Sequence, residues 1–263
     1  MKDMHEKRRR PAQTAPVEEI EGQLEGRNAL TEALKSGRTI DKVFIAAGDT
    51  DRALQRLAAQ AKEAGAVVVP VDRRKLDAMS TTHSHQGVIT LAAAHEYSTI
   101  DDILQEAADR GENALIVICD ELTDPHNLGA ILRSAECAGA HGVIIPKRRS
   151  VGLTAVVAKA SAGAVEYMKV ARVPNINNAI AALKEKGVWI FGTAAEGSIP
   201  MYQADLTGPA AIVIGNEGQG MSPLVRKNCD VTVNIPMKGR ISSLNASAAA
   251  SILLYEAVRQ RLG

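Results

Sequence analysis

Several apolar runs in the second half of the chain show no alternation between polar and apolar residues. Residues 114–119 and 211–214 contain only Ala, Leu, Ile, Val and Cys. A strand that is apolar on both sides is buried on both faces, as in a parallel sheet covered by helices above and below. The composition agrees, because 46% of the residues are hydrophobic and only 3% are aromatic, which suits α/β layers better than an all-β sandwich. We therefore predict an α/β fold with a mostly parallel sheet and helices on both faces.

The distribution of these runs divides the chain into four segments. Residues 1–18 are polar and basic and contain two prolines, so we expect a disordered basic arm. Residues 19–94 alternate short strands and helices and are expected to form a first, small α/β domain. Residues 95–111 are expected to be a linker and a first helix, and residues 112–263 hold the parallel sheet.

The charge of the chain is nearly balanced, with a formal net charge of +1. Contact with a nucleic acid must therefore come from local patches rather than from the whole surface. Three clusters of basic residues are candidates: Lys7–Arg10, Arg73–Lys75 and Lys147–Arg149. Taken alone, each cluster fits a solvated turn better than a binding site.

Cysteine and histidine usage excludes several classes of protein. Cys119, Cys137 and Cys229 are isolated, without a C-x-x-C pair, which favours a reducing cytosol over a disulfide scaffold. Cys119 and Cys137 fall in apolar or helical patterns and are expected to be buried. No apolar run reaches the ~18 residues that span a membrane, and the histidines form no cluster of metal ligands. We expect a cytoplasmic protein without a metal site.

The first unusual segment leads into a helix expected at residues 128–138, with Asn127 as its cap. Arg133 lies off the buried stripe of this helix. An arginine near a helix start opposes the helix dipole and needs another partner, and its donor fork suits a phosphate or a developing oxyanion. An ordinary surface arginine fits the pattern equally well. His126 fits a structural or RNA-contacting role better than a catalytic one.

A glycine-rich loop over residues 215–220 follows a buried strand and precedes a helix expected to begin at Ser222. Its three glycines allow the backbone to approach a ligand closely at the carboxyl end of a strand. The spacing is neither the dinucleotide fingerprint nor a P-loop, which would need a lysine. Glu217 offers a carboxylate that can bind a hydroxyl or an amine. A tight structural turn is the alternative interpretation.

The third segment, residues 235–248, leads into a helix expected at residues 243–261. Ser242 or Ser243 can cap this helix, which is also the structural explanation for both serines. Asn245 then falls just inside the helix, where asparagine has a poor propensity and must gain from a contact.

In this order, the three segments resemble the signature motifs of the SpoU/TrmH family of RNA ribose 2′-O-methyltransferases, and the resemblance covers residues 112–263. The motifs are N-x-G-A-x-x-R at 127–133, G-x-E-G-x-G at 215–220 and I-P-M-x-G-x-x-x-S-L-N-x-S at 235–247. The first domain is similar to the small α/β, L30e-like RNA-binding domain of some members, with His85-Gln86-Gly87 typical of that subgroup. Residues 147–154 are similar to the RlmB-like subgroup, which methylates a guanosine in 23S ribosomal RNA.

The resemblance implies a deep trefoil knot in the C-terminal domain, a homodimer, S-adenosylmethionine as the cofactor and structured RNA, most simply ribosomal RNA, as the partner. The implied catalytic residues are Arg133, Asn127, Glu217, Ser243 and Asn245. The implied cofactor-binding residues are Thr193, Ala194, Gly215, Asn216, Glu217, Gly218, Ile235, Pro236, Met237, Ser243, Leu244 and Asn245. The expected RNA-binding residues are Arg8, Arg9, Arg10, His85, Gln86, Lys147, Arg148 and Arg149.

Arg133 is often cast as the activating residue of this family, yet a guanidinium in a protein stays protonated. We therefore expect Arg133 to hold the adjacent phosphate and to stabilise the alkoxide as a cation, while Asn127, Ser243 and Asn245 position the ribose and the cofactor. Glu217 would fix either the cofactor loop or the target nucleotide. Transfer RNA is an alternative substrate, and an RNA-binding factor without catalysis is an alternative function. The missing fingerprint disfavours a dinucleotide-dependent oxidoreductase.

Overall fold

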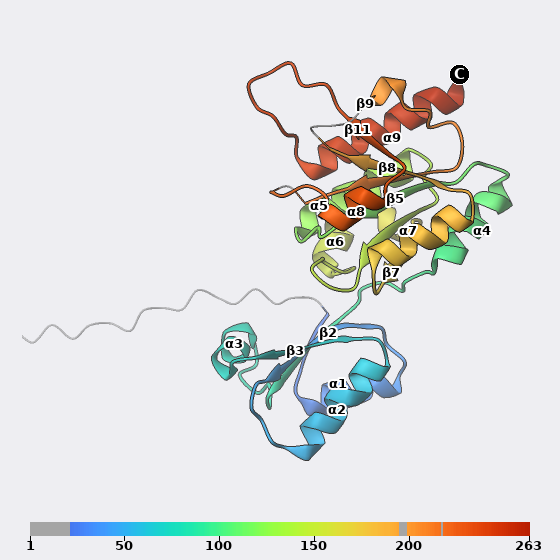
Figure 1. Cartoon of the computed structure of the whole chain (residues 1–263). Helices are drawn as coiled ribbons and strands as arrows, with labels where there is room; N and C mark the ends of the chain where they lie inside the picture. Colours follow the sequence, from blue (N-terminus) through green and yellow to red (C-terminus); the bar gives the residue numbers. More distant parts are fainter. Residues whose placement is uncertain (1–21, 195–198, 217) are drawn as a thin grey trace, which may run out of the picture.

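The computed structural model describes residues 22–194, 199–216 and 218–263, which form two α/β units with separate sheets (Figure 1). The first unit contains a four-stranded sheet and the second a seven-stranded sheet. The predicted basic arm, with Arg8, Arg9 and Arg10, and the predicted site residue Glu217 lie outside the described residues.

The first sheet is mixed, with the order β1-β4-β2-β3. β2 and β3 are parallel, and β4 is antiparallel to both of its neighbours. The strands are β1 (Gln23–Glu25), β2 (Ile40–Ala46), β3 (Val67–Val71) and β4 (Val88–Ala92). The helices are α1 (Arg27–Lys35), α2 (Arg52–Glu63) and α3 (Arg73–Met79). Leu30 and Leu54 bury α1 and α2 against one face of the sheet, and Leu76 buries α3 against the other.

The second sheet has the order β7-β6-β5-β10-β8-β11-β9, and every pair of neighbours is parallel. Its strands are β5 (Leu115–Cys119), β6 (Gly142–Pro146), β7 (Val170–Val173), β8 (Trp189–Thr193), β9 (Ile199–Pro200), β10 (Ala210–Ile214) and β11 (Val231–Asn234). β10 inserts between β5 and β8, which precede it in the chain. The carboxyl ends of strands that are distant in sequence therefore meet at one edge of the sheet.

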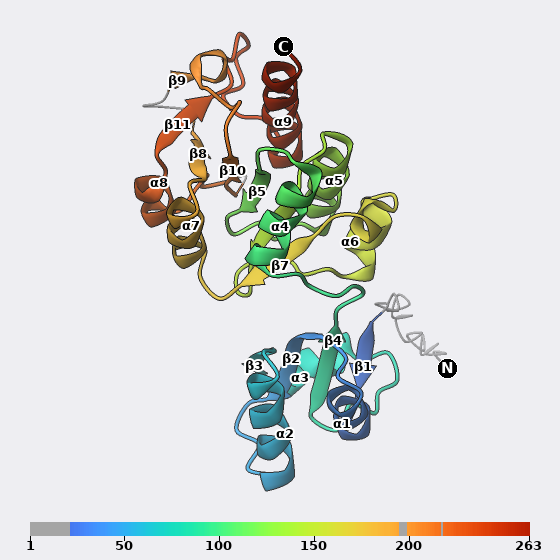
Figure 2. The same cartoon turned by 90° about the vertical axis from the view of Figure 1, so that its right-hand side faces the viewer.

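The side chains of β5 show why the apolar runs are continuous. Leu115, Val117 and Cys119 belong to the core on one face of the sheet, and Ile116 and Ile118 belong to the core on the other. The first face is covered by α5 (Pro125–Cys137), α6 (Ala155–Ala160) and α9 (Ala246–Leu262), and the second by α4 (Ile100–Arg110), α7 (Ile176–Glu185) and α8 (Pro223–Asn228) (Figure 2). Two short 3-10 turns are η1 (Ala164–Glu166) and η2 (Met201–Gln203). The predicted α/β fold with a parallel, doubly covered sheet is confirmed.

Helix α5 begins earlier than predicted. Asp124 is its cap, because its carboxylate accepts a hydrogen bond of 2.9 Å from the backbone N–H of His126. Pro125 fits the first helical position, where no backbone donor is needed. The predicted cap Asn127 therefore lies inside the helix, where it is buried. The prediction for Cys137 is wrong as well, since the thiol at the end of this helix is exposed.

Helix α9 begins later than predicted, at Ala246. Its cap is Asn245 rather than Ser242 or Ser243, and the Asn245 Oδ1 accepts a hydrogen bond of 3.0 Å from the backbone N–H of Ser247. Asparagine caps a helix as well as serine does. The poor propensity of asparagine for a helix interior therefore indicated that Asn245 precedes the helix as its cap. Across the described ranges, none of the helices combines the length and the apolarity needed to cross a membrane.

A buried polar network joins the two units. Arg172 on β7 forms an ion pair of 2.7 Å with Asp41 on β2, and each side chain is only 6% exposed. Tyr97, in the connecting segment, donates a hydrogen bond of 2.7 Å to the same carboxylate, and its ring centroid lies 5.3 Å from the guanidinium carbon of Arg172. Gly152 permits this approach, because a Cβ there would overlap with Asp41 and Tyr97.

Candidate functional site

A cavity of about 770 Å³ opens at the carboxyl ends of β8, β10 and β11. This volume lies within the range of sites that hold a small organic ligand. The predicted cofactor positions that line it are Thr193, Ala194, Gly215, Asn216, Gly218, Ile235, Pro236, Met237, Ser243 and Leu244. Lining residues that were not predicted to bind the cofactor include Gln219, Met221, Arg226, Asn234 and Ser242. The structure thus brings the second and third motifs together in one hollow.

The glycine-rich loop forms a closed turn at the edge of this cavity. Asn216 and Gly220 exchange backbone hydrogen bonds of 3.0 and 2.8 Å. The side-chain amide of Asn216 also donates to the carbonyl of Glu121 at 3.1 Å, which ties the loop to the segment after β5. A Cβ at Gly215 would overlap with the backbone of Gly220 and Met221. The loop therefore leaves no space for a larger residue at its first position.

Asp120 is a buried carboxylate at this edge that the motif analysis missed. It is 3% exposed, and its side chain accepts a hydrogen bond of 2.7 Å from the backbone N–H of Ser222. Its own N–H donates to the carbonyl of Ile214 at 2.8 Å. Asp120 thereby joins the end of β5 to both ends of the glycine-rich loop. The signal that could have found it is an acidic residue directly after the apolar run 114–119.

Two asparagines link the third motif to the first. The Asn245 side-chain amide donates a hydrogen bond of 2.8 Å to Asn127 Oδ1, and the Asn127 amide donates to Asp124 at 3.3 Å. Farther along the same pair of helices, the hydroxyls of Ser134 and Ser251 lie 2.7 Å apart. The loop that lines the cavity is therefore fixed to α5, the helix that carries Arg133.

Arg133 lies on the exposed side of α5 and does not line the cavity. His126 is exposed as well and precedes it by seven residues, which places both side chains on one side of the helix, about two turns apart. Arg133 makes no hydrogen bond or ion pair with any residue in the described part of the chain. Its guanidinium is thus presented to solvent, with its donors available to an external anion.

The thiols near the cavity are suited to packing rather than to nucleophilic chemistry. Cys229 lies against Gly192, where an added Cβ would meet its Sγ and the side chain of Met221. Burial raises the pKa of Cys229 to about 11 and that of Cys119 to about 12. At neutral pH both thiols stay protonated, so neither supplies a reactive thiolate.

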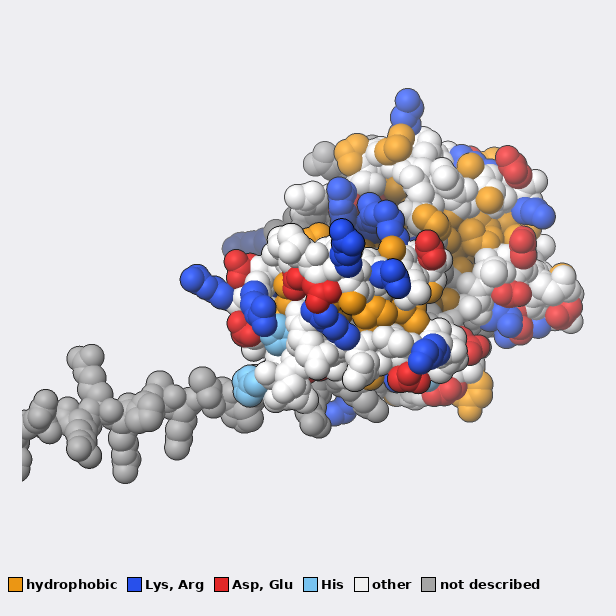
Figure 3. All heavy atoms as spheres, turned by 90° about the horizontal axis from the view of Figure 1, so that it is seen from below, with side chains coloured by type: hydrophobic (Ala, Val, Ile, Leu, Met, Phe, Trp, Pro, Cys, Tyr) orange, Lys and Arg blue, Asp and Glu red, His pale blue; other side chains and the backbone are white. Residues whose placement is uncertain are grey.

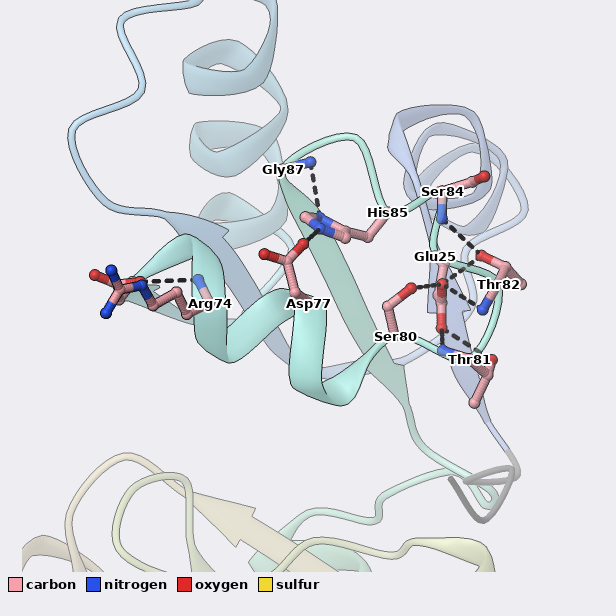
Figure 4. A network of polar contacts seen from close by, with 10 residues as sticks. Glu25, Arg74, Asp77, Ser80, Thr81, Thr82, Ser84, His85 and Gly87 are labelled. Atoms are coloured by element: carbon pink, nitrogen blue, oxygen red, sulfur yellow. Dashed lines mark hydrogen bonds and ion pairs between the residues drawn. The ribbon is translucent and has the colours of Figure 1, made fainter. Parts of the chain in front are cut away.

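In the first unit, Figure 4 shows a network of polar contacts that holds the loop between α3 and β4. The carboxylate of Glu25 accepts hydrogen bonds from the Ser80 hydroxyl at 2.6 Å, from the Thr81 backbone at 2.7 Å and from Thr82. Partial burial alone would raise the pKa of Glu25, but the hydrogen bonds from Ser80 and Thr82 outweigh it and hold this pKa well below its usual range.

The same loop carries His85 and Gln86, of which the first is buried and the second is exposed. His85 is buried, with its Nε2 2.9 Å from Asp77 Oδ1 and its Nδ1 accepting from the backbone N–H of Gly87 at 3.1 Å (Figure 4). Gln86 is exposed and has a φ of 49°, and its Oε1 accepts from the backbone of Arg27 at 3.2 Å. His85 therefore shapes the loop, while Gln86 stands on its surface.

The basic cluster Lys147–Arg149 directly follows β6, at the carboxyl edge of the sheet. Lys147 is partly buried, and its Nζ donates to the carbonyl of Gly65 in the first unit at 3.4 Å. Arg148 is exposed. Arg149 pairs with Glu121 at 2.9 Å. The cluster thus lies where the two units face each other.

The large cavity combines polar backbone edges with apolar side chains, and this combination fits a nucleoside-like molecule. The glycine-rich loop contributes backbone N–H and C=O groups, which bind the edges of a base or the hydroxyls of a sugar. Leu244 and Leu253 contribute apolar surface for the faces of a ring. The absence of a Cβ at Gly215 lets such a ligand approach the backbone directly.

Comparison with known proteins agrees with this arrangement. Residues 114–255 match the model of the SpoU rRNA Methylase family, and residues 23–98 match a domain described as "RNA 2'-O ribose methyltransferase substrate binding". A relative from Bacillus subtilis (strain 168), named "Putative TrmH family tRNA/rRNA methyltransferase YacO", is 46% identical over 236 residues, which cover 90% of this chain and 94% of the relative.

Two solved structures with bound AdoMet resemble the chain. The SpoU methyltransferase AviRb from Streptomyces viridochromogenes, in complex with the cofactor AdoMet, has a TM-score of 0.59 and 27% identity and covers 91% of this chain and 90% of its own. An AdoMet-bound rRNA methyltransferase from Sinorhizobium meliloti has a TM-score of 0.59 and 27% identity, with 92% and 88% covered. The resemblance inferred from the three motifs is confirmed: this chain is an RNA methyltransferase and belongs to the SpoU family.

Proposed function

We propose that this protein uses S-adenosylmethionine to methylate a ribose 2′-hydroxyl in structured RNA, and that its target is a guanosine in 23S ribosomal RNA. The observation that carries the proposal is the cavity of about 770 Å³, which the second and third motifs line together. The substrate-binding domain matched at residues 23–98 and the AdoMet-bound relatives support the reaction and the cofactor. The stretch 147–154 supports the ribosomal target. We place the enzyme in the cytoplasm.

The residues of the cavity would bind and orient the cofactor. When bound, S-adenosylmethionine supplies a methyl group on a sulfonium, which a ribose oxygen can attack. The turn Gly215–Gly220 would hold the adenosine part against its backbone, while Ile235–Met237 and Leu244 would add side-chain contacts from the third motif. Alignment of the reacting atoms alone can supply several kcal/mol of the barrier reduction, roughly 7–11 in favourable cases. Asn127 and Asn245, joined by their hydrogen bond, would fix the third motif during this alignment.

Arg133 would act on the substrate side of the reaction. Its guanidinium stays charged, so it would bind the phosphate next to the target ribose and stabilise negative charge on the 2′-oxygen as the proton leaves. Its exposure on α5 favours contact with an incoming RNA over contact with this chain. Ser243, which lines the cavity, would position the ribose or the cofactor.

The RNA would approach across both units. Gln86, on the surface of the first unit, and the cluster Lys147–Arg149 would contact its backbone, and Arg8, Arg9 and Arg10 would add charge from the N-terminal arm. Such contacts weaken steeply with salt. His85 would contribute by holding the loop that presents Gln86.

A homodimer is part of the proposal. α9 carries the exposed apolar side chains Tyr255 (51%) and Leu262 (82%), whose burial a second copy would provide. Because Arg133 does not line the cavity of its own chain, the dimer would also decide which cavity it serves. Sedimentation velocity measures the assembly, and a monomer at assay concentration would contradict this part.

The experiment that tests the function is a map of 2′-O-methylation in ribosomal RNA from cells lacking this protein. The expected result is the loss of one guanosine methylation in 23S RNA, restored by the intact gene. Transfer RNA is the second candidate substrate, because the Bacillus relative is named for both RNAs. Loss of a transfer-RNA methylation with an unchanged ribosomal pattern would favour that substrate.

A further inference from the structure

A second cavity, of about 610 Å³, lies between the two units. Ala59 and Lys62 on α2 and Val68 on β3 line it from the first unit, and Lys147 and Pro174 line it from the loops after β6 and β7. We propose that this interdomain cleft binds a single-stranded stretch of the substrate RNA next to the nucleotide that is methylated. The inference rests on the proposed function and extends it to the path of the RNA.

The charge of the cleft fits a polyanion. Its lining contains the three cations Lys62, Lys147 and Arg148, and no described acidic residue lines it. Lys62 and Arg148 are exposed, so their charges face solvent at the mouth of the cleft. Figure 3, the view from below, shows Lys and Arg side chains beside hydrophobic surface on this face of the molecule, with Asp and Glu side chains among them. Several positive charges around a hollow attract the phosphates of RNA, and the counterions of these phosphates are released when the RNA binds.

The floor of the cleft favours unpaired RNA over a double helix. Ile45, Ala58, Ala66, Val67 and Val68 contribute aliphatic side chains to its lining, beside the three cations. In an A-form helix the bases are stacked inside and only phosphates, sugars and groove edges are displayed. An apolar floor gains contact only from bases or sugars that are splayed out of such a helix.

The position of the cleft connects it to the methylation site. Lys147 follows β6 and Gly215 follows β10, and both lie at the carboxyl edge of the same parallel sheet. Only β5 separates these strands, so the two loops start about 10 Å apart, which is two spacings between neighbouring strands. A short stretch of RNA leaving the cleft would reach the cofactor cavity without crossing the sheet.

The walls of the cleft are held in place before RNA arrives. Arg172, already paired with Asp41, donates hydrogen bonds to the backbone carbonyl of Asp41 at 3.0 Å and to that of Lys147 at 3.4 Å. The buried ion pair between the units therefore also fixes a residue that lines the cleft. A preformed cleft avoids the entropic cost of ordering its walls on binding.

The test uses a fluorescently labelled single-stranded RNA oligonucleotide of mixed sequence and the same strand annealed to its complement. Ala59→Glu and Lys62→Glu place negative charge in the cleft. Ala53→Glu is the matched control on the exposed part of α2, and Lys186→Glu is the matched control before β8, at the opposite edge of the sheet. Affinity is measured by anisotropy over a range of salt, and S-adenosylmethionine binding by calorimetry on every variant.

The expected result is that each cleft variant weakens single-strand binding about tenfold, and that Lys62→Glu, which removes a cation, also lowers the salt slope by about 1. The control variants should stay close to the wild type, and cofactor affinity should be unchanged throughout. Cleft variants that weaken binding no more than their controls, or that weaken duplex binding as much as single-strand binding, would overturn the proposal. Failure of the wild type to bind the cofactor would instead count against the proposed function, and the RNA measurements would still stand by themselves.

Discussion

Gly215 marks the point where the backbone of the glycine-rich loop folds back on itself. Gly215→Ala adds a Cβ that overlaps with Gly220 and Met221, so the loop must shift at an expected cost of about 1–3 kcal/mol. Calorimetry should show S-adenosylmethionine binding weakened about 10- to 100-fold. Gly208→Ala is the matched control, because residue 208 lies outside the three motifs and a Cβ there meets nothing within 4 Å. Equal affinity of the two variants would disprove the role of Gly215.

Arg133 gives a second prediction at this scale. Arg133→Ala should lower the rate of methyl transfer by about 10²–10³, the usual effect of losing a group that stabilises an oxyanion. Cofactor affinity should not change, because Arg133 does not line the cavity. Arg133→Lys should recover only part of the rate, since a lysine lacks the two-pronged fork. Full recovery by lysine in single-turnover assays would rule out a bidentate contact with phosphate.

Glu25 links stability to pH. Its folded-state pKa lies below the usual value because hydrogen bonds to Ser80 and Thr82 outweigh partial burial. The stability it contributes is therefore present above the usual glutamate pKa of about 4.3 and is lost as pH falls toward the folded-state pKa.

Glu25→Gln should lower the free energy of unfolding at pH 7 by about 1–2 kcal/mol, after allowance for solvent exposure. The difference in unfolding free energy between Glu25→Gln and the wild type should become smaller in acid. Urea denaturation at pH 7 and at an acidic pH measures it. Glu63→Gln, at the exposed end of α2, should show no such difference. A gap between Glu25→Gln and the wild type that widens in acid would reverse the assigned sign.

The residues of the site were only partly predictable. Glycines and motif residues such as Gly215 and Leu244 could be found because their chemistry is unusual for their local surroundings. Asp120 was missed, since one acidic residue after an apolar strand is a common pattern and its partners are distant in sequence. The buried position of His85 could not be predicted from the sequence either, because its burial depends on how α3 packs beside the loop.

Among the elements, the start of α9 has two separable functions. Asn245 caps the helix and also donates a hydrogen bond to Asn127 on α5. Asn245→Asp keeps the cap but removes the amide that donates. We expect Asn245→Asp to keep the contribution of the cap to the unfolding free energy but to lose that of the hydrogen bond to Asn127, together with a lower rate of methyl transfer.

Asn245→Ala loses both functions and should also lose about 1 kcal/mol of stability. Denaturation and methylation assays on the two variants measure the two effects independently. If Asn245→Asp were as active as the wild type, the link to α5 would have no part in the reaction.

Most elements were predictable from local pattern, and their boundaries were less so. The apolar runs without alternating polar residues indicated β5 and β10, because a parallel strand that is buried on both sides has no polar face. The starts of α5 and α9 were misplaced by three residues each, since several capping residues are adjacent in both segments. The choice among them depends on which side chain is engaged in a tertiary contact. Asn127 is engaged in this way, because it accepts a hydrogen bond from Asn245.

At the scale of the whole molecule, Gly152 controls how closely the two units approach. Gly152→Ala places a Cβ against Asp41 and Tyr97, which should loosen the interface without removing a charge. Small-angle scattering should show a larger radius of gyration and a broader distribution of distances. Gly208→Ala, where a Cβ meets nothing within 4 Å, should match the wild type. Identical scattering from both variants would show that the interface tolerates the change.

The arrangement of the units could not be predicted from the chain. The pairing of Arg172 with Asp41 joins residues far apart in sequence, and neither residue lies in a recognisable pattern. The order of the seven strands is equally hidden, because the insertion of β10 between β5 and β8 leaves no trace in periodicity. The trefoil knot that the family resemblance implies stays a prediction, because a knot leaves no trace in the periodicity of the chain either.

The cap at Asn245 has a consequence for synthesis of the protein. The residues that line the cavity fall between 193 and 253, and hydrogen bonds tie both α9, residues 246–262, and its cap Asn245 to α5. A nascent chain with α9 still inside the ribosome would have both sheets available to fold, but would lack the part of the cavity lining that α9 supplies. The pocket of such an enzyme is complete only after α9 has emerged and packed.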